Sequence, residues 1–193
     1  MSIADKFTLS RLLLAPVFFV LYFLPVWLDV DPVLITVIIV PLVAFMEFTD
    51  YLDGHYARKY NEVSDFGKLF DPFADVVAHL TILFCLVISD YFPSWIFILI
   101  FYREFCMLFI RLIAIQKGVA IAARKGGKLK TVLYIVTGFY YLAIELSKRC
   151  GISFGNSLEG LIVGGYVLSA ICLLASYVSF VDYLIHFKKL FKK

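Results

Sequence analysis

Long apolar runs separated by short polar segments make up most of the chain. Six of these runs approach the roughly 20 mainly apolar residues that cross the hydrocarbon core of a bilayer. They cover residues 9–28, 32–51, 73–88, 94–115, 132–146 and 161–187. The third and fifth runs are short for a membrane span. We therefore expect their helices to extend into the polar residues before them, 65–72 and 128–131.

This pattern predicts an all-α fold, a polytopic membrane protein built as a bundle of six transmembrane helices. No internal repeat or low-complexity linker divides the 193 residues, so we expect a single domain over residues 1–193. The composition agrees, because 62% of the residues are hydrophobic, against about 45–50% apolar residues in a soluble domain. The formal net charge of +3 is too small to indicate a nucleic-acid partner, and we expect none.

The positions of Lys and Arg predict the orientation of the helices, because short cytoplasmic loops are enriched in these residues. If the N-terminus is cytoplasmic, most of the 18 Lys and Arg residues fall in cytoplasmic segments. The loops on the opposite side then contain only Lys148 and Arg149, while Arg103 and Arg111 lie within the fourth span. We therefore expect both termini to be cytoplasmic.

The segment with the densest charge, residues 50–75, reads DYLDGHYARKYNEVSDFGKLFDPFAD. It connects the second predicted helix to the third, on the cytoplasmic side. Two carboxylates and two small residues share one helical face there, at positions i, i+3, i+4 and i+7: Asp50, Asp53, Gly54 and Ala57. Asp71 and Asp75 are one turn apart on the next helix. We expect the four carboxylates to converge.

Carboxylates in or near a membrane are costly unless they are paired or bind a cation. Hard divalent cations such as Mg²⁺ take oxygen ligands and commonly bridge carboxylates to substrate phosphates. The charged segment therefore predicts a metal and phosphate site. Gly54 and Ala57 leave room for a ligand to approach the helix backbone, and the neighbouring Arg58 has the planar guanidinium that binds phosphate with two hydrogen bonds.

The spacing of these residues resembles the signature of the CDP-alcohol phosphatidyltransferase family. The eight matching positions are Asp50, Asp53, Gly54, Ala57, Arg58, Gly67, Asp71 and Asp75. The resemblance implies a reaction in which the hydroxyl of an alcohol attacks the β-phosphorus of a CDP-linked lipid, giving a phosphodiester and CMP. It also implies two divalent metal ions, Mg²⁺ or Mn²⁺, and a homodimer.

The same resemblance implies a role for each of these positions. Asp50, Asp53 and Asp71 would hold the metal ions. Asp75 would help to ligate them and would act as the general base on the acceptor hydroxyl. The pocket for the CDP group would be lined by Gly54, Ala57, Arg58 and Gly67.

Three further segments resemble the bacterial phosphatidylglycerophosphate synthases of this family: FGKLFDPFAD, YREFCMLFIR and GGKLKT. This resemblance implies CDP-diacylglycerol as the donor and sn-glycerol 3-phosphate as the acceptor. It also implies that the protein lies among membrane lipids in the cell inner (cytoplasmic) membrane, with the active site facing the cytoplasm. The acceptor phosphate is a dianion that needs several cations, and we expect Arg111, Lys128 and Lys130 to bind it.

Other interpretations stay open at this point. Val76 stands where these synthases usually have Lys, and ADVV is similar to phosphatidylserine synthases, so serine, inositol phosphate or phosphatidylglycerol are alternative acceptors. Lys128 and Lys130 also suit membrane anchors, and Glu104 and Arg111, seven apart on one helix, suit a structural ion pair. The alternative from another class is a membrane cation-binding or transport protein, with the carboxylates on an ion path.

Overall fold

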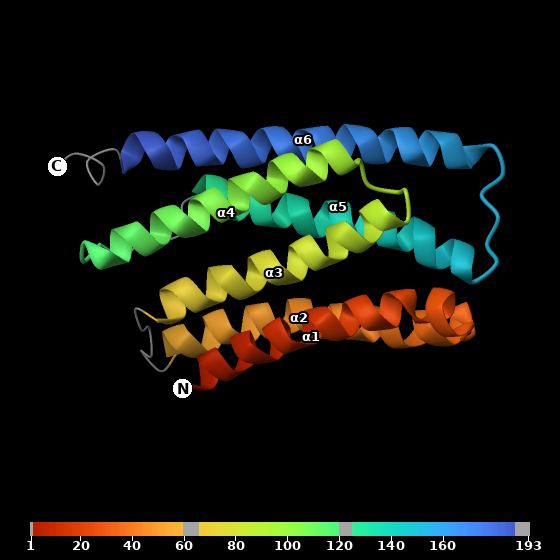
Figure 1. Ribbon diagram of the computed structural model, residues 1–193, viewed down its shortest axis with the longest axis horizontal. Helices are drawn as coiled ribbons and strands as arrows, with labels where there is room; N and C mark the ends of the chain where they lie inside the picture. Colours follow the sequence, from red (N-terminus) through yellow and green to blue (C-terminus); the bar gives the residue numbers. More distant parts are fainter. Residues whose placement is uncertain (1, 60–65, 120–124, 188–193) are drawn as a thin grey trace. The chain divides into compact units, whose positions relative to one another are not determined.

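The computed structural model describes residues 2–59, 66–119 and 125–187, and six α-helices account for most of them. Side chains are described within these ranges except at residues 3, 4, 51, 53, 55, 57–59 and 125. The helices, drawn in Figure 1, are α1 (Ile3–Leu28), α2 (Pro32–Lys59), α3 (Gly67–Ile88), α4 (Ser94–Gln116), α5 (Lys125–Arg149) and α6 (Ser157–His186). These ranges contain no strand, and the prediction of an all-α fold is confirmed.

The helices run further into polar sequence than the apolar runs do. α3 begins at Gly67 and α5 at Lys125, so the expected extension of these two helices is confirmed. α2 continues past its predicted end at residue 51 and reaches Lys59. At the other end of the chain, Ser2 and Asp5 form a capping box that starts α1: each side chain accepts a hydrogen bond from the backbone N–H of the other residue.

Five of the six helices are long and apolar enough to cross a membrane. These segments are Asp5–Leu28, Pro32–Asp50, Gly67–Ile88, Gly126–Arg149 and Ser157–His186. α4 has sufficient length, at 23 residues, but Arg103, Glu104 and Arg111 interrupt its apolar sequence. Charged side chains inside a span need partners within the protein, and the partners of Arg103 and Glu104 are described below.

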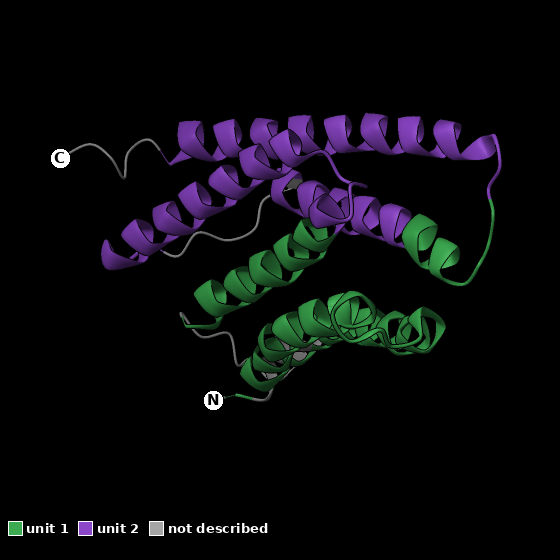
Figure 2. Cartoon of the chain, turned by 45° about the vertical axis from the view of Figure 1, so that its right-hand side comes forward, with its two compact units in different colours: residues 1–85, 143–153 green, residues 86–142, 154–193 purple. Residues whose placement is uncertain are grey.

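The chain forms two compact units, coloured separately in Figure 2. Unit 1 contains Met1–Cys85 together with Ala143–Ser153, and unit 2 contains Leu86–Leu142 together with Phe154–Lys193. α1, α2 and most of α3 thus belong to unit 1, whereas α4, most of α5 and α6 belong to unit 2.

Unit 1 is built on α1 and α2, which lie side by side along their lengths (Figure 1). Large side chains from these helices and from α3 are fully buried, among them Phe18, Tyr22, Ile39, Met46 and Leu83. Several aromatic rings on α1 pack against one another, including Phe18 with Tyr22 at a centroid distance of 5.7 Å. The buried face of α1, which includes Phe18 and Tyr22, therefore belongs to the core of unit 1.

The last turn of α5 contributes an ion pair to unit 1. Arg149 donates to Glu145, one turn earlier, and to the backbone carbonyl of Tyr22 at 3.0 Å. Its guanidinium also lies over the Tyr22 ring, 4.4 Å from the centroid. Arg149, paired with Glu145, therefore holds the end of α5 against α1.

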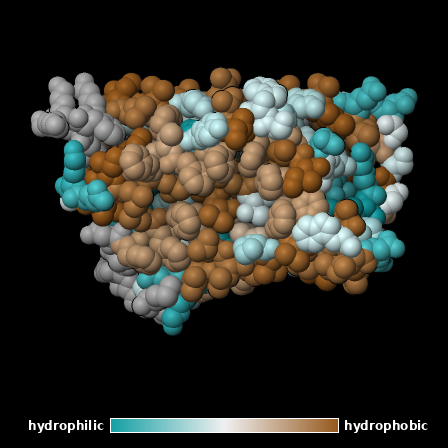
Figure 3. All heavy atoms as spheres, in the orientation of Figure 1, coloured by the Kyte–Doolittle hydropathy of each residue, from teal (hydrophilic) through white to brown (hydrophobic). Residues whose placement is uncertain are grey.

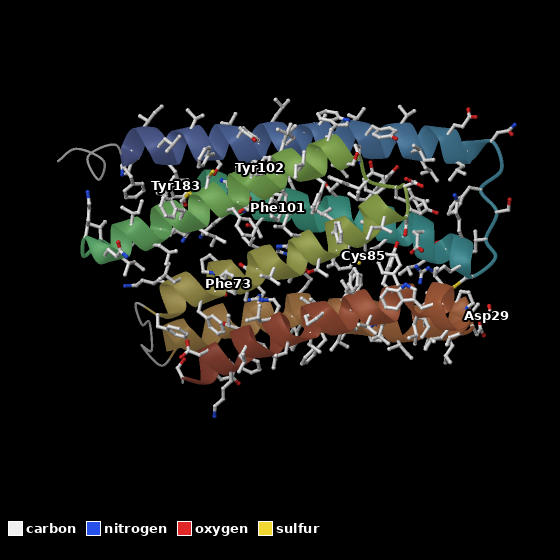
Figure 4. The ribbon with its side chains drawn as sticks, in the orientation of Figure 1. Asp29, Phe73, Cys85, Phe101, Tyr102 and Tyr183 are labelled. Atoms are coloured by element: carbon white, nitrogen blue, oxygen red, sulfur yellow. The ribbon has the colours of Figure 1, made fainter. Side chains whose placement is uncertain are left out.

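Unit 2 depends on a stripe of mainly small residues along α6. The buried positions of this helix are Gly165, Ser169, Cys172, Ser176, Ser179 and Tyr183, which recur every three or four residues. Small side chains let helix backbones approach closely in membrane proteins. At one end of the stripe, Tyr183 points from α6 toward α4 (Figure 4) and packs against Met107, Ile110 and Ala114.

The outward faces of the helices are apolar. Brown, hydrophobic side chains cover most of the face drawn in Figure 3. On α6, large exposed apolar residues line the sides opposite the small stripe, including Val163, Val167, Leu174 and Val178. Such a surface suits lipid or another apolar partner more than water.

We predict that Gly165→Ala destabilises the protein. A Cβ at this position would lie 2.6 Å from two ring carbons of Tyr141, a fully buried side chain whose hydroxyl bonds Ser169. Forcing a methyl group into a packed site costs about 1–3 kcal/mol, so the melting temperature in detergent should fall by roughly 5 °C. Gly160→Ala on the same helix is the control, because a Cβ there meets nothing within 4 Å. Equal melting temperatures for the two variants would contradict this packing.

Candidate active site

Three carboxylates meet in unit 1. One oxygen each from Asp50 on α2 and from Asp71 and Asp75 on α3 lie within 4.8 Å of one another. Asp71 and Asp75 are one helical turn apart, so both project from the same side of α3. The three side chains are 38%, 43% and 23% exposed, respectively, so a ligand from solution has access to them. We call these three residues the carboxylate cluster.

Arg11 from α1 lies against all three carboxylates. Its Nη1 is 2.5 Å from Oδ1 of Asp50, while its Nη2 is 2.8 Å from Oδ1 of Asp71 and 3.0 Å from Oδ1 of Asp75. In contrast to its partners, Arg11 is only 2% exposed. One guanidinium therefore joins three helices, and it does so from the buried side of the cluster.

Arg11 contributed to the predicted orientation only as one of the 18 Lys and Arg residues. A signal was present, because Arg11 lies inside the first apolar run, and a charged residue within a membrane span usually has a function or a specific partner. The identity of its partners depends on how α1 is rotated against α2 and α3. The helical period within α1 alone does not supply that rotation.

The carboxylate cluster fits a hard divalent cation. Its donors are all carboxylate oxygens, which Mg²⁺ and Mn²⁺ prefer. Oxygens that share one octahedral Mg²⁺ at about 2.1 Å lie about 3–4 Å apart, so the 4.8 Å spread requires only a small contraction. In the described contacts, the three carboxylates share one guanidinium, and such a set of acidic oxygens attracts cations.

A second pair of polar side chains lies on the same two helices, one helical turn away from residues of the cluster. Nε2 of His79 on α3 is 3.3 Å from Oε1 of Glu47 on α2. Glu47 precedes Asp50 by three residues and His79 follows Asp75 by four, so each is one helical turn from a carboxylate of the cluster. The sequence analysis did not predict this pair, which ties α2 to α3 next to the site.

The other residues of the predicted signature are only partly described. The side chains of Asp53, Ala57 and Arg58 lie outside the described part of the structure, although their backbone belongs to α2. Gly54 is half-buried on α2, one turn after Asp50, and Gly67 is the first residue of α3. Both glycines thus lie on the helices that carry the cluster.

A buried polar network in unit 2 surrounds Glu104 on α4, which is 2% exposed. Lys130 on α5 donates to both carboxylate oxygens of Glu104 at 2.9 Å. Arg103 donates to Oε1 at 2.8 Å, and the Tyr134 hydroxyl donates to the same oxygen at 2.7 Å. Tyr134 also bonds Ser176 at 2.7 Å. Helices α4, α5 and α6 are therefore joined through one carboxylate.

Arg103 is held by α6 as well as by Glu104. Its Nε donates to the backbone carbonyl of Ser176 at 3.1 Å, and its guanidinium lies 5.7 Å from the centroid of the Phe180 ring. In the described contacts, two cations, Arg103 and Lys130, thus share the carboxylate of Glu104.

The three basic residues predicted to bind an acceptor phosphate all lie in unit 2. Lys130 is buried, and its described partners are Glu104 and the Tyr134 ring, 4.7 Å from the ammonium. Arg111 is half-buried on α4, two turns after Glu104, and Lys128 is exposed in the first turn of α5. Among the described residues, Glu104 pairs with Arg103 and Lys130 rather than with Arg111, so the alternative of a Glu104–Arg111 ion pair is wrong.

Comparisons with known proteins agree on one family. The family model described as CDP-alcohol phosphatidyltransferase matches residues 1–180. A Treponema pallidum protein named CDP-diacylglycerol–glycerol-3-phosphate 3-phosphatidyltransferase is 36% identical over 190 residues, which cover 93% of this chain and 88% of the relative. A Bacillus subtilis protein with the same name is 37% identical over 141 residues, or 70% of this chain and 73% of the relative.

A third similar protein, from Rickettsia typhi, also carries this name and is 30% identical over 132 residues, or 68% of this chain and 71% of the relative. The family model spans nearly the whole chain, including both helices that carry the carboxylate cluster. The chain therefore belongs to the CDP-alcohol phosphatidyltransferase family.

Proposed function

We propose that this protein transfers the phosphatidyl group of CDP-diacylglycerol to sn-glycerol 3-phosphate and releases CMP, a step of phospholipid biosynthesis. The observation that carries the proposal is the carboxylate cluster, whose three residues stand at aspartate positions of the family signature. The names of the three relatives support this donor and this acceptor. Family membership and these names favour the transferase over a cation transporter and over the alternative acceptors.

The reaction breaks one phosphoanhydride bond and forms one phosphodiester bond. The acceptor hydroxyl attacks the β-phosphorus of the CDP-lipid, and the bond from that phosphorus to the bridging oxygen breaks, so that CMP leaves with the bridging oxygen. Asp75 takes the proton of the attacking hydroxyl on a carboxylate oxygen. The Asp75 carboxylate suits this role because its side chain is 23% exposed and is therefore accessible to a bound acceptor.

We propose that Asp50, Asp53, Asp71 and Asp75 hold two divalent ions, Mg²⁺ or Mn²⁺. When bound, these ions neutralise the charge of the pyrophosphate. Three of the four residues form the carboxylate cluster, and the backbone of Asp53 lies one turn from Asp50 on the same helix. The chain itself positions these oxygens, because each aspartate is carried by a regular helix rather than by a loop.

We propose that the CDP group binds next to the cluster, in a pocket lined by Gly54, Ala57, Arg58 and Gly67. Gly54 follows Asp50 by one helical turn, and Gly67 precedes Asp71 by one turn. A missing side chain at these positions lets phosphate and ribose approach the backbone. The guanidinium of Arg58 is the group suited to bidentate contact with phosphate.

Arg111, Lys128 and Lys130 are our proposed site for the acceptor phosphate. The support comes from the type of side chain: all three residues are basic, and Lys130 lies in a buried network together with a second cation, Arg103. A phosphate dianion binds such cations with charge-assisted hydrogen bonds. Within this site, Lys130 is the residue whose position Glu104 fixes.

The arrangement in the membrane is also proposed. We place six spans in the inner (cytoplasmic) membrane, with both termini and the carboxylate cluster on the cytoplasmic side, because this orientation leaves only Lys148 and Arg149 in the opposite loops. α4 is the proposed sixth span, and two of its three charged residues, Arg103 and Glu104, have partners within unit 2. We treat residues 1–193 as one transferase domain, since the family model runs through both units. The homodimer that the family resemblance implies is also part of the proposal.

The first prediction for the reaction concerns the cluster. Asp50→Ala, Asp53→Ala, Asp71→Ala and Asp75→Ala should each reduce CMP release at least about 100-fold, because each removes a metal ligand worth several kcal/mol in the transition state. EDTA should abolish activity, and added Mg²⁺ or Mn²⁺ should restore it. The control is Glu159→Ala, an exposed carboxylate in the first turn of α6. Full activity of the purified protein in EDTA, or near-normal rates in two of the aspartate variants, would rule out the two-metal site.

The second prediction separates the base from the metal ligands. Asp75→Asn keeps the size of the side chain and one ligating oxygen, but the amide does not accept the proton. The value of kcat should therefore fall more than the affinity for CDP-diacylglycerol does. The measurement compares kcat with the dissociation constant of the CDP-lipid. Equal losses in both would assign Asp75 to metal binding alone.

The third prediction tests the acceptor. Arg111→Ala should raise KM for glycerol 3-phosphate about tenfold or more, because a lost charge-assisted contact costs roughly 1.5–3 kcal/mol. KM for CDP-diacylglycerol should change little, and Lys148→Ala, an exposed lysine near the end of α5, is the control. The wild-type protein should not use serine. If serine is the better acceptor, or if the Arg111 variant has normal glycerol 3-phosphate kinetics, the proposed acceptor is incorrect.

A further inference from the structure

Arg11 lies where a divalent cation would also have to bind. Two of its nitrogens contact oxygens of Asp50, Asp71 and Asp75 at 2.5–3.0 Å. These three carboxylates also provide the oxygens within 4.8 Å that fit a metal ion. A guanidinium and a divalent cation therefore have the same partners in this site.

We infer that Arg11 is a built-in counter-ion of the carboxylate cluster, which holds the cluster together without metal and competes with divalent cations for it. The inference rests on the metal site proposed above. It assigns to Arg11 a positioning role: the guanidinium acts through the metal ligands and does not itself take part in the reaction.

The burial of the four residues supports competition over simple scaffolding. Arg11 approaches from the protein interior, where it is 2% exposed, whereas Asp71 remains 43% exposed on the opposite side. A cation from solution can therefore reach the carboxylates while Arg11 is in place. Its positive charge then repels the incoming ion, and the carboxylate oxygens are shared between the two.

This competition links metal binding to substrate binding. Arg11 lowers the negative charge available to a metal ion in the empty site, so metal affinity is weak there. The two phosphates of a bound CDP group add negative charge and donor oxygens, which raises the affinity. By linkage, the metal must raise the affinity for CDP by the same factor. Arg11 thus makes tight metal binding depend on the nucleotide.

The test measures Mn²⁺ binding directly, by the electron paramagnetic resonance signal of free Mn²⁺ in a titration of the purified full chain in detergent. Wild type is compared with Arg11→Met and Arg11→Gln, each with and without CDP as the soluble probe. Arg149→Met is the matched control, because Arg149 also pairs with a carboxylate in unit 1 but lies far along the chain and contacts Glu145 and Tyr22 instead.

Competition predicts that, without CDP, both Arg11 variants bind Mn²⁺ at least tenfold more tightly than wild type does. It also predicts that CDP increases the Mn²⁺ affinity of the variants by a smaller factor than that of wild type. Arg149→Met should stay within twofold of wild type. Scaffolding alone predicts the opposite sign, because carboxylates that separate bind metal more weakly. Unchanged or weaker binding in the Arg11 variants, or equal tightening by Arg149→Met, would overturn the inference.

Three further outcomes are informative. If Arg11→Met is recovered only when Mn²⁺ is present throughout purification, the metal has replaced the missing counter-ion, which supports the inference; the Arg11→Gln titration then supplies the affinity. If wild type binds Mn²⁺ but the Arg11 variants bind it no more tightly, the proposed role of Arg11 is incorrect and the metal site is retained. If wild type binds no Mn²⁺ even with CDP, the metal site and the role of Arg11 both fail.

Discussion

The contact between Arg11 and the carboxylate cluster is the interaction on which unit 1 depends. A charge inside a membrane protein is costly unless another charge or a ligand compensates it. Removing one partner of a buried ion pair is strongly destabilising, since the other charge remains behind. Arg11 comes from α1 and its partners come from α2 and α3. The compensation therefore fixes how three helices are rotated, and it brings three aspartates of the family signature, Asp50, Asp71 and Asp75, to one place.

The same constraint shapes unit 2 around a charge of the opposite sign. Glu104 is satisfied by Arg103, Lys130 and Tyr134 at hydrogen-bond distances. The small residues on α6, such as Ser176, let this helix approach the network closely enough for the Ser176 hydroxyl to bond Tyr134 and for its backbone carbonyl to accept from Arg103. A Gly or Ser in this stripe thus contributes to electrostatics as well as to packing. Larger residues there would separate the groups that compensate Glu104.

The sequence was sufficient for features that lie within one helix. Apolar length predicted the helices, and the spacing of Asp71 and Asp75 placed them on one side of α3. It was insufficient for contacts between helices. Helices that are apolar on most sides show little amphipathic pattern, so their rotation is not evident from the sequence. Arg11 with the aspartates, Glu47 with His79, and Lys130 with Glu104 all depend on that rotation.

The two clusters gather side chains of opposite charge. In the described contacts, three carboxylates share the guanidinium of Arg11, whereas Arg103 and Lys130 share the carboxylate of Glu104. Acidic side chains attract a cation, and basic side chains attract a phosphate. The proposed reaction needs both a cation and a phosphate to bind, and each unit concentrates side chains of the sign that suits one of them.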